Sequence, residues 1–263
     1  MLELFLLSML VGLIAGLLAG LFGLGGGVLI VPALVLLFSA HEFPAELVMI
    51  MAVATSLSTI VFTASASIVA HYKLGSIKWQ TVLRLSPGIL LGASIGAMVA
   101  DFIEAEILKD LFVVYLLFVA FRMALPKKNS QELKQVGAWL DYLMGNAIGF
   151  LSSILGIGGG TLTVPYLLSR QLAMKNAVAV SSACGFPIAV SGAVMYVLLG
   201  YGHDALPEWS LGYVYLPALA GIVLCSVVTA PIGARLANKL PARQLKRYFS
   251  IVLFLIAAKM IAG

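Results

Sequence analysis

The feature that most constrains this chain is a glycine-rich motif that occurs twice within apolar sequence, at Gly23 and again 133 residues later at Gly156. Both copies have the form Gly-x-Gly-Gly-Gly followed by four residues and a proline, Pro32 in the first and Pro165 in the second. Three further blocks recur in the same order: Ala52-Val53-Ala54-x-Ser56 with Ala177-Val178-Ala179-x-Ser181, Trp79 and Pro87 with Trp209 and Pro217, and Leu108-Lys109-x-x-Phe112 with Leu245-Lys246-x-x-Phe249. We therefore predict two homologous halves, residues 1–125 and 136–263, joined by a charged linker at 126–135.

The composition places both halves in a membrane. Of the 263 residues, 62% are apolar and only 10% are charged, against about 25% charged in soluble domains. Such a chain cannot cover a water-soluble surface with polar groups. This excludes a soluble enzyme and, despite the net charge of +5, a nucleic-acid-binding protein. The predicted class is an all-α polytopic membrane protein with about eight to ten membrane segments.

Apolar runs and the breakers between them predict ten segments. They cover residues 2–22, 28–38, 47–70, 80–100 and 108–125 in the first half, and 138–155, 161–172, 177–200, 211–234 and 246–262 in the second. The segment at 28–38 is about 16 Å long, roughly half of a hydrocarbon core of ~30 Å. We predict that it and 161–172 are half-helices, which either cross or re-enter. The first segment, 2–22, is expected to be a retained membrane helix and not a cleaved signal peptide.

Equivalent loops of the two halves carry opposite charge. The loop after the third segment holds Lys73, Lys78 and Arg84, whereas its counterpart holds Asp204 and Glu208 and no Lys or Arg. Two further pairs of loops show the same reversal: Glu42 and Glu46 against Arg170 and Lys175, and Asp101, Glu104, Glu106, Lys109 and Asp110 against Arg235, Lys239, Arg243, Lys246 and Arg247. Because Lys and Arg in short loops favour the cytoplasmic side, we predict two inverted repeats with the linker inside and both termini outside.

The two glycine runs are predicted to break their helices and to form the substrate site. Three consecutive glycines disfavour a helix, and unwound backbone at membrane depth is tolerated only where it is buried in protein or lines a cavity. A short helix begins after each run, so its free amides and positive dipole end can bind an anion. The candidate ligands are the backbone amides of Gly25, Gly26 and Gly27 and of Gly158, Gly159 and Gly160. The alternative is a tight helix crossing without a ligand.

Hydroxyl side chains supplement the amides in this interpretation. On the third segment Ser56, Thr59, Thr63 and Ser67 share one helix face, and the eighth segment offers Ser181, Ser182, Cys184 and Ser191. Ser56 and Ser181 are equivalent in the repeat, so we expect these two to line the site. The alternative is that such hydroxyls bond to carbonyls of their own or a neighbouring helix.

Other features predict packing and no chemistry. Gly12, Gly16 and Gly20, and likewise Gly88, Gly92 and Gly96, lie four residues apart and are expected to form close helix contacts. No Asp or Glu sits in the middle of an apolar segment, and His41, His71 and His203 fall in or beside loops. We therefore expect no catalytic residues, no metal site and no cofactor, and hence no enzyme.

The sequence resembles the TauE/SafE family of membrane permeases, the sulfite exporter family. The resemblance is carried by Gly23–Gly27 with Pro32, by the run from Ala52 to Leu57, and by their second copies. It covers nearly the whole chain, although Val180 and Ser182 stand where the first half has Thr55 and Leu57. The resemblance implies a bacterial-type carrier in the plasma (inner) membrane for sulfur-containing anions such as sulfite, thiosulfate or organosulfonates.

Our prediction is a secondary transporter that moves such an anion by alternating access, most simply outward, with the anion held at the two glycine-rich breaks. The alternatives are an anion channel of the same architecture, a carrier of another small anion, a non-transporting membrane anchor, and a carrier of cations or neutral metabolites. The expected partners are the small anion and the lipid bilayer. The exact substrate, the coupling ion and the oligomeric state stay open.

Overall fold

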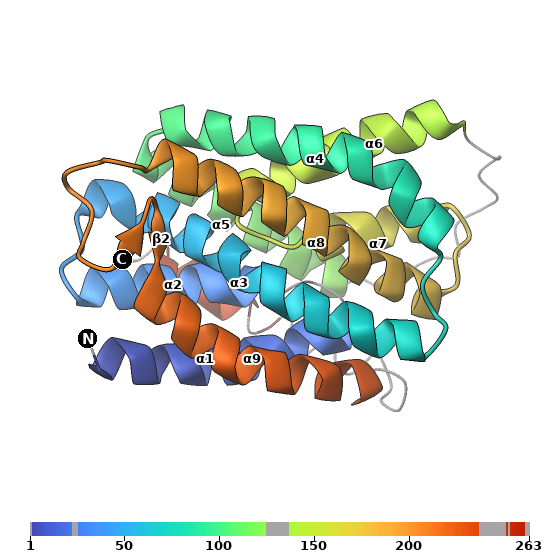
Figure 1. The fold of residues 1–263 in the computed structure, drawn as a ribbon, viewed down its shortest axis with the longest axis horizontal. Helices are drawn as coiled ribbons and strands as arrows, with labels where there is room; N and C mark the ends of the chain where they lie inside the picture. Colours follow the sequence, from blue (N-terminus) through green and yellow to red (C-terminus); the bar gives the residue numbers. More distant parts are fainter. Residues whose placement is uncertain (1, 23–25, 125–136, 237–250, 252, 261–263) are drawn as a thin grey trace.

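The computed structural model describes residues 2–22, 26–124, 137–236, 251 and 253–260. Within these residues the chain is almost entirely helical (Figure 1). The first half forms α1 (Leu2–Phe22), α2 (Gly27–Ala40), α3 (Ala45–Lys73), α4 (Trp79–Phe102) and α5 (Ala105–Ala124). The second forms α6 (Ala138–Ile154), α7 (Gly160–Ser169), α8 (Met174–Leu199), the strands β1 (Ser210–Leu211) and β2 (Val214–Tyr215), and α9 (Leu216–Leu236). Residues 253–260 are also helical.

The structure confirms the predicted all-α membrane class. Five of the described helices, α1, α3, α4, α8 and α9, are long and apolar enough to cross a membrane. The half-helices predicted at 28–38 and 161–172 are α2 and α7. The linker predicted at 126–135 lies outside the described residues, as do residues 246–250, 252, 261 and 262 of the predicted tenth segment.

One predicted boundary is wrong. The ninth segment was expected to begin at residue 211, but the helix begins at Leu216, and a small hairpin precedes it. Trp209 and Gly212 adopt left-handed backbone conformations there, with φ of 68° and 55°, which a helix does not accommodate. The amide of Tyr215 donates a hydrogen bond of 3.0 Å to Thr55 Oγ1, so the hairpin is fixed to α3.

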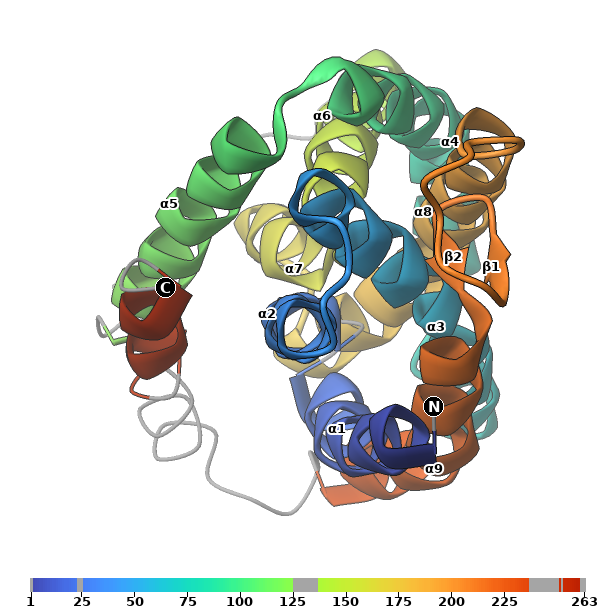
Figure 2. The ribbon, with the colours of Figure 1, turned by 90° about the vertical axis from the view of Figure 1, so that its left-hand side faces the viewer.

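The half-helix α7 turns back toward the end of the bundle at which α6 begins, as a re-entrant segment does. Asp141 lies near the start of α6, and Tyr166 and Arg170 lie at the far end of α7, yet their side chains are in contact. The chain therefore enters through α6, turns at the glycine run and returns through α7 to the level at which it started. In Figure 2, α2 and α7 lie in the middle of the bundle with the longer helices around them.

The two ends of the bundle differ in charge. In Figure 1 the turns from α2 to α3 and from α4 to α5 lie at the left end with the hairpin, and the turns from α3 to α4 and from α7 to α8 lie at the right end. The left, or acidic, end carries Glu42, Glu46, Asp101, Glu104, Glu106, Asp204 and Glu208; the right, or basic, end carries Lys73, Lys78, Arg84, Arg170, Lys175 and Arg235. The equivalent helices α3 and α8 run in opposite directions between these ends, as inverted repeats require.

The glycine faces bring the two halves together. A Cβ atom at Gly16 of α1 would lie 2.6 Å from the Cα of Ser226 in α9, and one at Gly92 of α4 would lie 2.8 Å from the carbonyl carbon of Asn146 in α6. These distances are too short for any side chain, so α1 packs on α9 and α4 on α6 backbone to backbone. The close contacts predicted at Gly12, Gly16, Gly88, Gly92 and Gly96 are confirmed, and they join helices of opposite halves.

Candidate functional site

The two glycine runs end in the same local structure. Gly26 precedes α2 with φ of 79°, and Gly159 precedes α7 with φ of 71°, both left-handed. The carbonyl of Gly26 accepts hydrogen bonds from the amides of Leu29 and Ile30, and that of Gly159 from Leu162 and Thr163, at 2.7–3.1 Å. The left-handed backbone costs about 1–2 kcal/mol for a residue with a Cβ. Glycine is therefore required at the start of both half-helices.

The two breaks meet in the centre of the bundle. A Cβ atom at Gly27 would lie 2.8 Å from the Cα of Ile157, so the start of α2 touches the loop before α7. Neither half-helix has a side chain that caps its first amides. The positive ends of both helices therefore lie in the protein interior with backbone donors available, which favours an anion nearby.

The structure brings most of the predicted site residues together. Gly26 and Gly27 contribute from one break and Gly158–Gly160 from the other, whereas Gly25 lies outside the described residues. Ser56 is fully buried on α3, and its hydroxyl donates a hydrogen bond of 2.7 Å to the carbonyl of Gly156. It therefore ties a helix of the first half to the break of the second half. Ser181, its equivalent on α8, is also fully buried and likewise engaged.

A small cavity adjoins the break of the second half. The space open to the centre of a water molecule is about 10 Å³, which is room for about one water. The lining residues come from α1, α3, α8 and the break: Ala19, Thr63, Ala64, Ser67, Gly158, Ser182 and Gly185. Within the described part of the chain, the hydroxyls of Ser67 and Ser182 are buried and have no hydrogen-bond partner.

Sequence reasoning did not select Ser67 and Ser182 as site residues, although it noted both hydroxyls. Buried hydroxyls without partners cost about 1–3 kcal/mol each, so they are rare unless a ligand or water satisfies them. No Lys, Arg or His is among the residues that line the described cavity. The cavity therefore combines two free hydroxyl donors with the backbone of Gly158, two residues before α7.

The cavity lies beside the second glycine break, where the two copies of the repeat differ in sequence. Ser182 and Gly185 on α8 are equivalent to Leu57 and Ile60 on α3, which are large and fully buried. A Cβ atom at Gly185 would lie only 3.1 Å from the carbonyl oxygen of Gly158. The substitution of small residues for large ones thus opens space beside the second break, and the difference between the two copies was the sequence signal that marks it.

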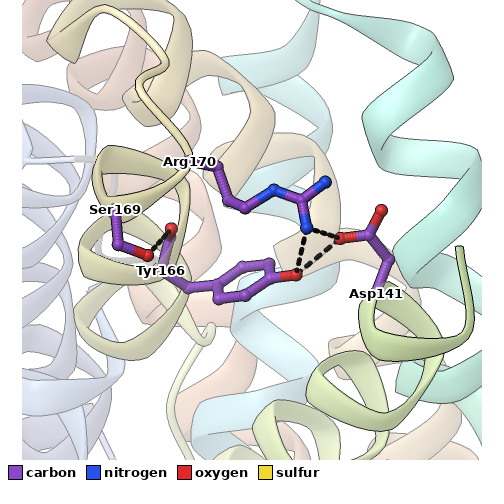
Figure 3. Close-up of polar contacts among 4 residues, drawn as sticks. All are labelled: Asp141, Tyr166, Ser169 and Arg170. Atoms are coloured by element: carbon purple, nitrogen blue, oxygen red, sulfur yellow. Dashed lines mark hydrogen bonds and ion pairs between the residues drawn. The ribbon is translucent and has the colours of Figure 1, made fainter. Parts of the chain in front are cut away.

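A buried polar cluster fixes the C-terminal end of α7 (Figure 3). The hydroxyl of Tyr166 donates to Asp141 Oδ1 at 2.5 Å, and Arg170 Nη1 lies 3.3 Å from the same oxygen. Ser169 donates a hydrogen bond to the carbonyl of Tyr166 within α7. The Asp141 side chain is only 4% exposed, so its charge is compensated mainly by this pair. The cluster holds α7 against α6 and positions the break from the basic end.

Comparison with known proteins supports a transporter. The family model described as sulfite exporter TauE/SafE matches residues 8–260. A "probable membrane transporter protein" of Haemophilus influenzae is 40% identical over 256 residues, 97% of each chain. Similar proteins occur in Methanocaldococcus jannaschii, at 29% identity over 94% of this chain and 91% of the relative, and in Bacillus subtilis, where YunE is 26% identical over 98% and 97%. No solved structure matches this chain.

Proposed function

We propose that this chain, which belongs to the sulfite exporter TauE/SafE family and is a membrane transporter, carries a small sulfur-containing anion such as sulfite, thiosulfate or an organosulfonate. Transport runs by alternating access, most simply outward. The anion binds in the centre of the bundle, beside the break at Gly158–Gly160. Transport itself rests on family membership, and the substrate class and the position of the site are our proposal.

One observation carries the proposed site: two buried hydroxyls that have no partner in the described part of the chain line a cavity beside an uncapped helix start. The oxygens of a sulfur oxyanion accept hydrogen bonds, and the Ser67 and Ser182 hydroxyls can donate them. Each hydrogen bond to a charged group is worth about 1.5–3 kcal/mol. The amides of Gly158–Gly160 and the dipole of α7 add donors without a cationic side chain.

Ser56 and Ser181 belong to the proposed site as positioning residues. The proton of Ser56 is already donated to Gly156, so Ser56 holds the break in the geometry that the anion meets. By the repeat, we propose that Ser181 supports the first break in the same way, so that the amides of Gly26 and Gly27 also belong to the site; the proposal keeps Gly25 as a site residue from the sequence alone. The anion itself contacts Ser67 and Ser182.

The size of the cavity indicates that the bundle must open for transport. It has room for about one water, which is less than a sulfite ion needs. The half-helices α2 and α7 lie inside the bundle and are short, so they and the breaks between them are the elements that a rocking motion of the repeats displaces. We propose that this motion opens the cavity to each end of the bundle in turn.

Transport by the full chain reconstituted in liposomes tests the proposal. Sulfite, thiosulfate and methanesulfonate are compared with chloride and acetate as control anions. We expect saturable uptake of a sulfur anion and accelerated exchange when the same anion is present on the other side. Ohmic single-channel current would replace the carrier by a channel, and equal transport of acetate would remove the sulfur specificity.

A further inference from the structure

A stripe of polar side chains runs along α3 from the breaks to the basic end. Ser56, Thr59, Thr63, Ser67 and His71 follow one another at spacings of three, four, four and four residues, so they share one helix face. All five are buried. Thr63 and Ser67 line the cavity, and His71 follows Ser67 by one further turn. A buried polar face of this length on a membrane helix indicates a polar path and not lipid contact.

The members of this stripe nearest the basic end, Ser67 and His71, have unused hydrogen-bonding groups. Ser56 and Thr59 donate to the carbonyls of Gly156 and Ser56. By contrast, Ser67 Oγ and both ring nitrogens of His71 have no hydrogen-bond partner among the described residues, although His71 is only 3% exposed. A buried imidazole with two unsatisfied nitrogens is costly unless something else binds to it. Within the described residues, His71 is therefore a buried group that is available to a ligand.

Two polar residues of α8 lie on the helix face that leads to the cavity. Lys175, in the first turn of α8, is exposed and acts electrostatically on His71. Seven residues further on, two helical turns away on the same face, is Ser182, which lines the cavity. The polar path to the cavity is therefore the α3 face that begins at His71, and Lys175 adds a positive charge near its start.

We propose that His71 and Lys175 form an anion-binding station at the basic end of the path to the cavity, and that His71 takes up a proton when the anion binds. The inference rests on the proposed function, since it assigns the entry site and the coupling ion of the same transporter. The ligand is the transported sulfur oxyanion, which accepts hydrogen bonds from the imidazolium and attracts the Lys175 ammonium.

The coupling follows from the charges around His71. The charged side chains at this end on the neighbouring elements are Lys73 on α3, Lys78 and Arg84 at the start of α4, Lys175 on α8 and Arg235 on α9, and they are exposed cations. Within the described residues the acid at this end is Asp141, which is paired with Arg170. Among the described residues, the free charges at this end are thus all positive. A bound anion reverses that balance, and by linkage a protonated His71 binds the anion more tightly.

The sign of the pH dependence is therefore fixed. Anion affinity rises as the pH falls through the titration of His71, and each anion that binds brings a proton with it. Transport of an anion that does not itself titrate in this range must still depend on pH.

The test uses the full chain in liposomes and methanesulfonate, which stays an anion throughout, between about pH 5 and 8, where histidine titrates. For the wild-type protein we expect apparent affinity to increase about tenfold toward the acidic limit. His71→Gln should transport with a flat pH profile. The matched control is His203→Gln, an exposed histidine at the acidic end, which should keep the wild-type profile.

Lys175→Gln supplies an independent test, because this exposed residue can be changed without disturbing the fold. Removing its charge should move the midpoint of the pH profile upward and weaken methanesulfonate binding. Proton uptake on binding, followed with a pH indicator in weakly buffered detergent solution, should be present in the wild-type protein and absent in His71→Gln. A wild-type protein that transports sulfur anions with no pH dependence, or a His71→Gln variant with the wild-type profile, overturns the station. Failure of the wild-type protein to transport any sulfur anion overturns the proposed function instead.

Discussion

Replacing Ser182 by alanine separates ligand binding from folding, because its hydroxyl has no partner among the described residues. If the anion accepts a hydrogen bond from this hydroxyl, the variant loses about 1.5–3 kcal/mol of binding free energy, a roughly ten- to hundredfold weaker affinity. The fold loses no hydrogen bond in exchange. We expect the free energy of unfolding to stay the same or to rise slightly, since a buried unsatisfied hydroxyl is removed.

Ser56→Ala should show the opposite pattern. The Ser56 hydroxyl donates to the carbonyl of Gly156 in a fully buried setting, so its removal leaves that oxygen unpaired. The expected loss is about 1–3 kcal/mol of stability. A loss of affinity in Ser182→Ala and a loss of stability in Ser56→Ala would distinguish a serine that contacts the ligand from one that positions the break.

The assay combines binding and unfolding of the same purified variants in detergent. Affinity is measured by thiosulfate or sulfite titration, and stability by the midpoint of thermal unfolding. Ser65→Ala is the matched control, because Ser65 lies on α3 and bonds only to the carbonyl of Val61 in its own helix. If Ser182→Ala binds as tightly as the wild-type protein while Ser65→Ala binds more weakly, the cavity is not the site.

Three further predictions concern the glycine breaks, the polar cluster of Asp141 and Arg170, and the orientation of the chain in the membrane. Gly26→Val and Gly159→Val should insert in the membrane but lose transport, because a β-branched residue resists the left-handed backbone at the start of each half-helix; normal transport by both would contradict a role for the breaks. Asp141→Asn leaves Arg170 as an unpaired charge, which for a fully buried pair lowers stability by about 3–5 kcal/mol. We expect a smaller loss here, because the Arg170 side chain is partly exposed. Adding Arg170→Gln to the Asp141→Asn variant should restore part of the loss, as measured by thermal unfolding. A cysteine at Asn129 should react with an impermeant reagent only from the cytoplasmic side, and labelling from outside alone would invert the proposed topology.

The architecture could be predicted from the sequence because its signals are local and repeated. Half-helices follow from the short apolar runs after the glycines, and the contacts between α1 and α9 and between α4 and α6 follow from glycines spaced by four residues. The inverted arrangement of the two repeats follows from the opposite charges of their equivalent loops, which can be counted in the sequence. Each of these features is fixed by residues close together in the chain, and each occurs twice.

What the sequence did not predict depends on residues far apart. The hydrogen bond from Ser56 to Gly156 joins positions 100 residues apart, and no spacing in either segment indicates it. The Asp141–Arg170 pair forms only because α7 folds back along α6, which the charge pattern alone leaves undecided. The choice of hydroxyls differs for the same reason, that it depends on packing between distant segments. The repeat favoured Ser56 and Ser181 as site residues, whereas the cavity lies beside Ser67 and Ser182.

In the proposed site, the departure from perfect repetition gives a symmetric scaffold room for one small anion. Two equal breaks facing each other would offer two equal sites, or a single site on the symmetry axis. Leu57 and Ile60 fill the space beside one break, and Ser182 and Gly185 leave it open beside the other. Under this proposal the anion meets neutral donors in the cavity, which bind it more weakly than a buried Lys or Arg would. A transporter needs such moderate affinity, because a substrate held by a full buried charge would be released too slowly at the far side of the membrane.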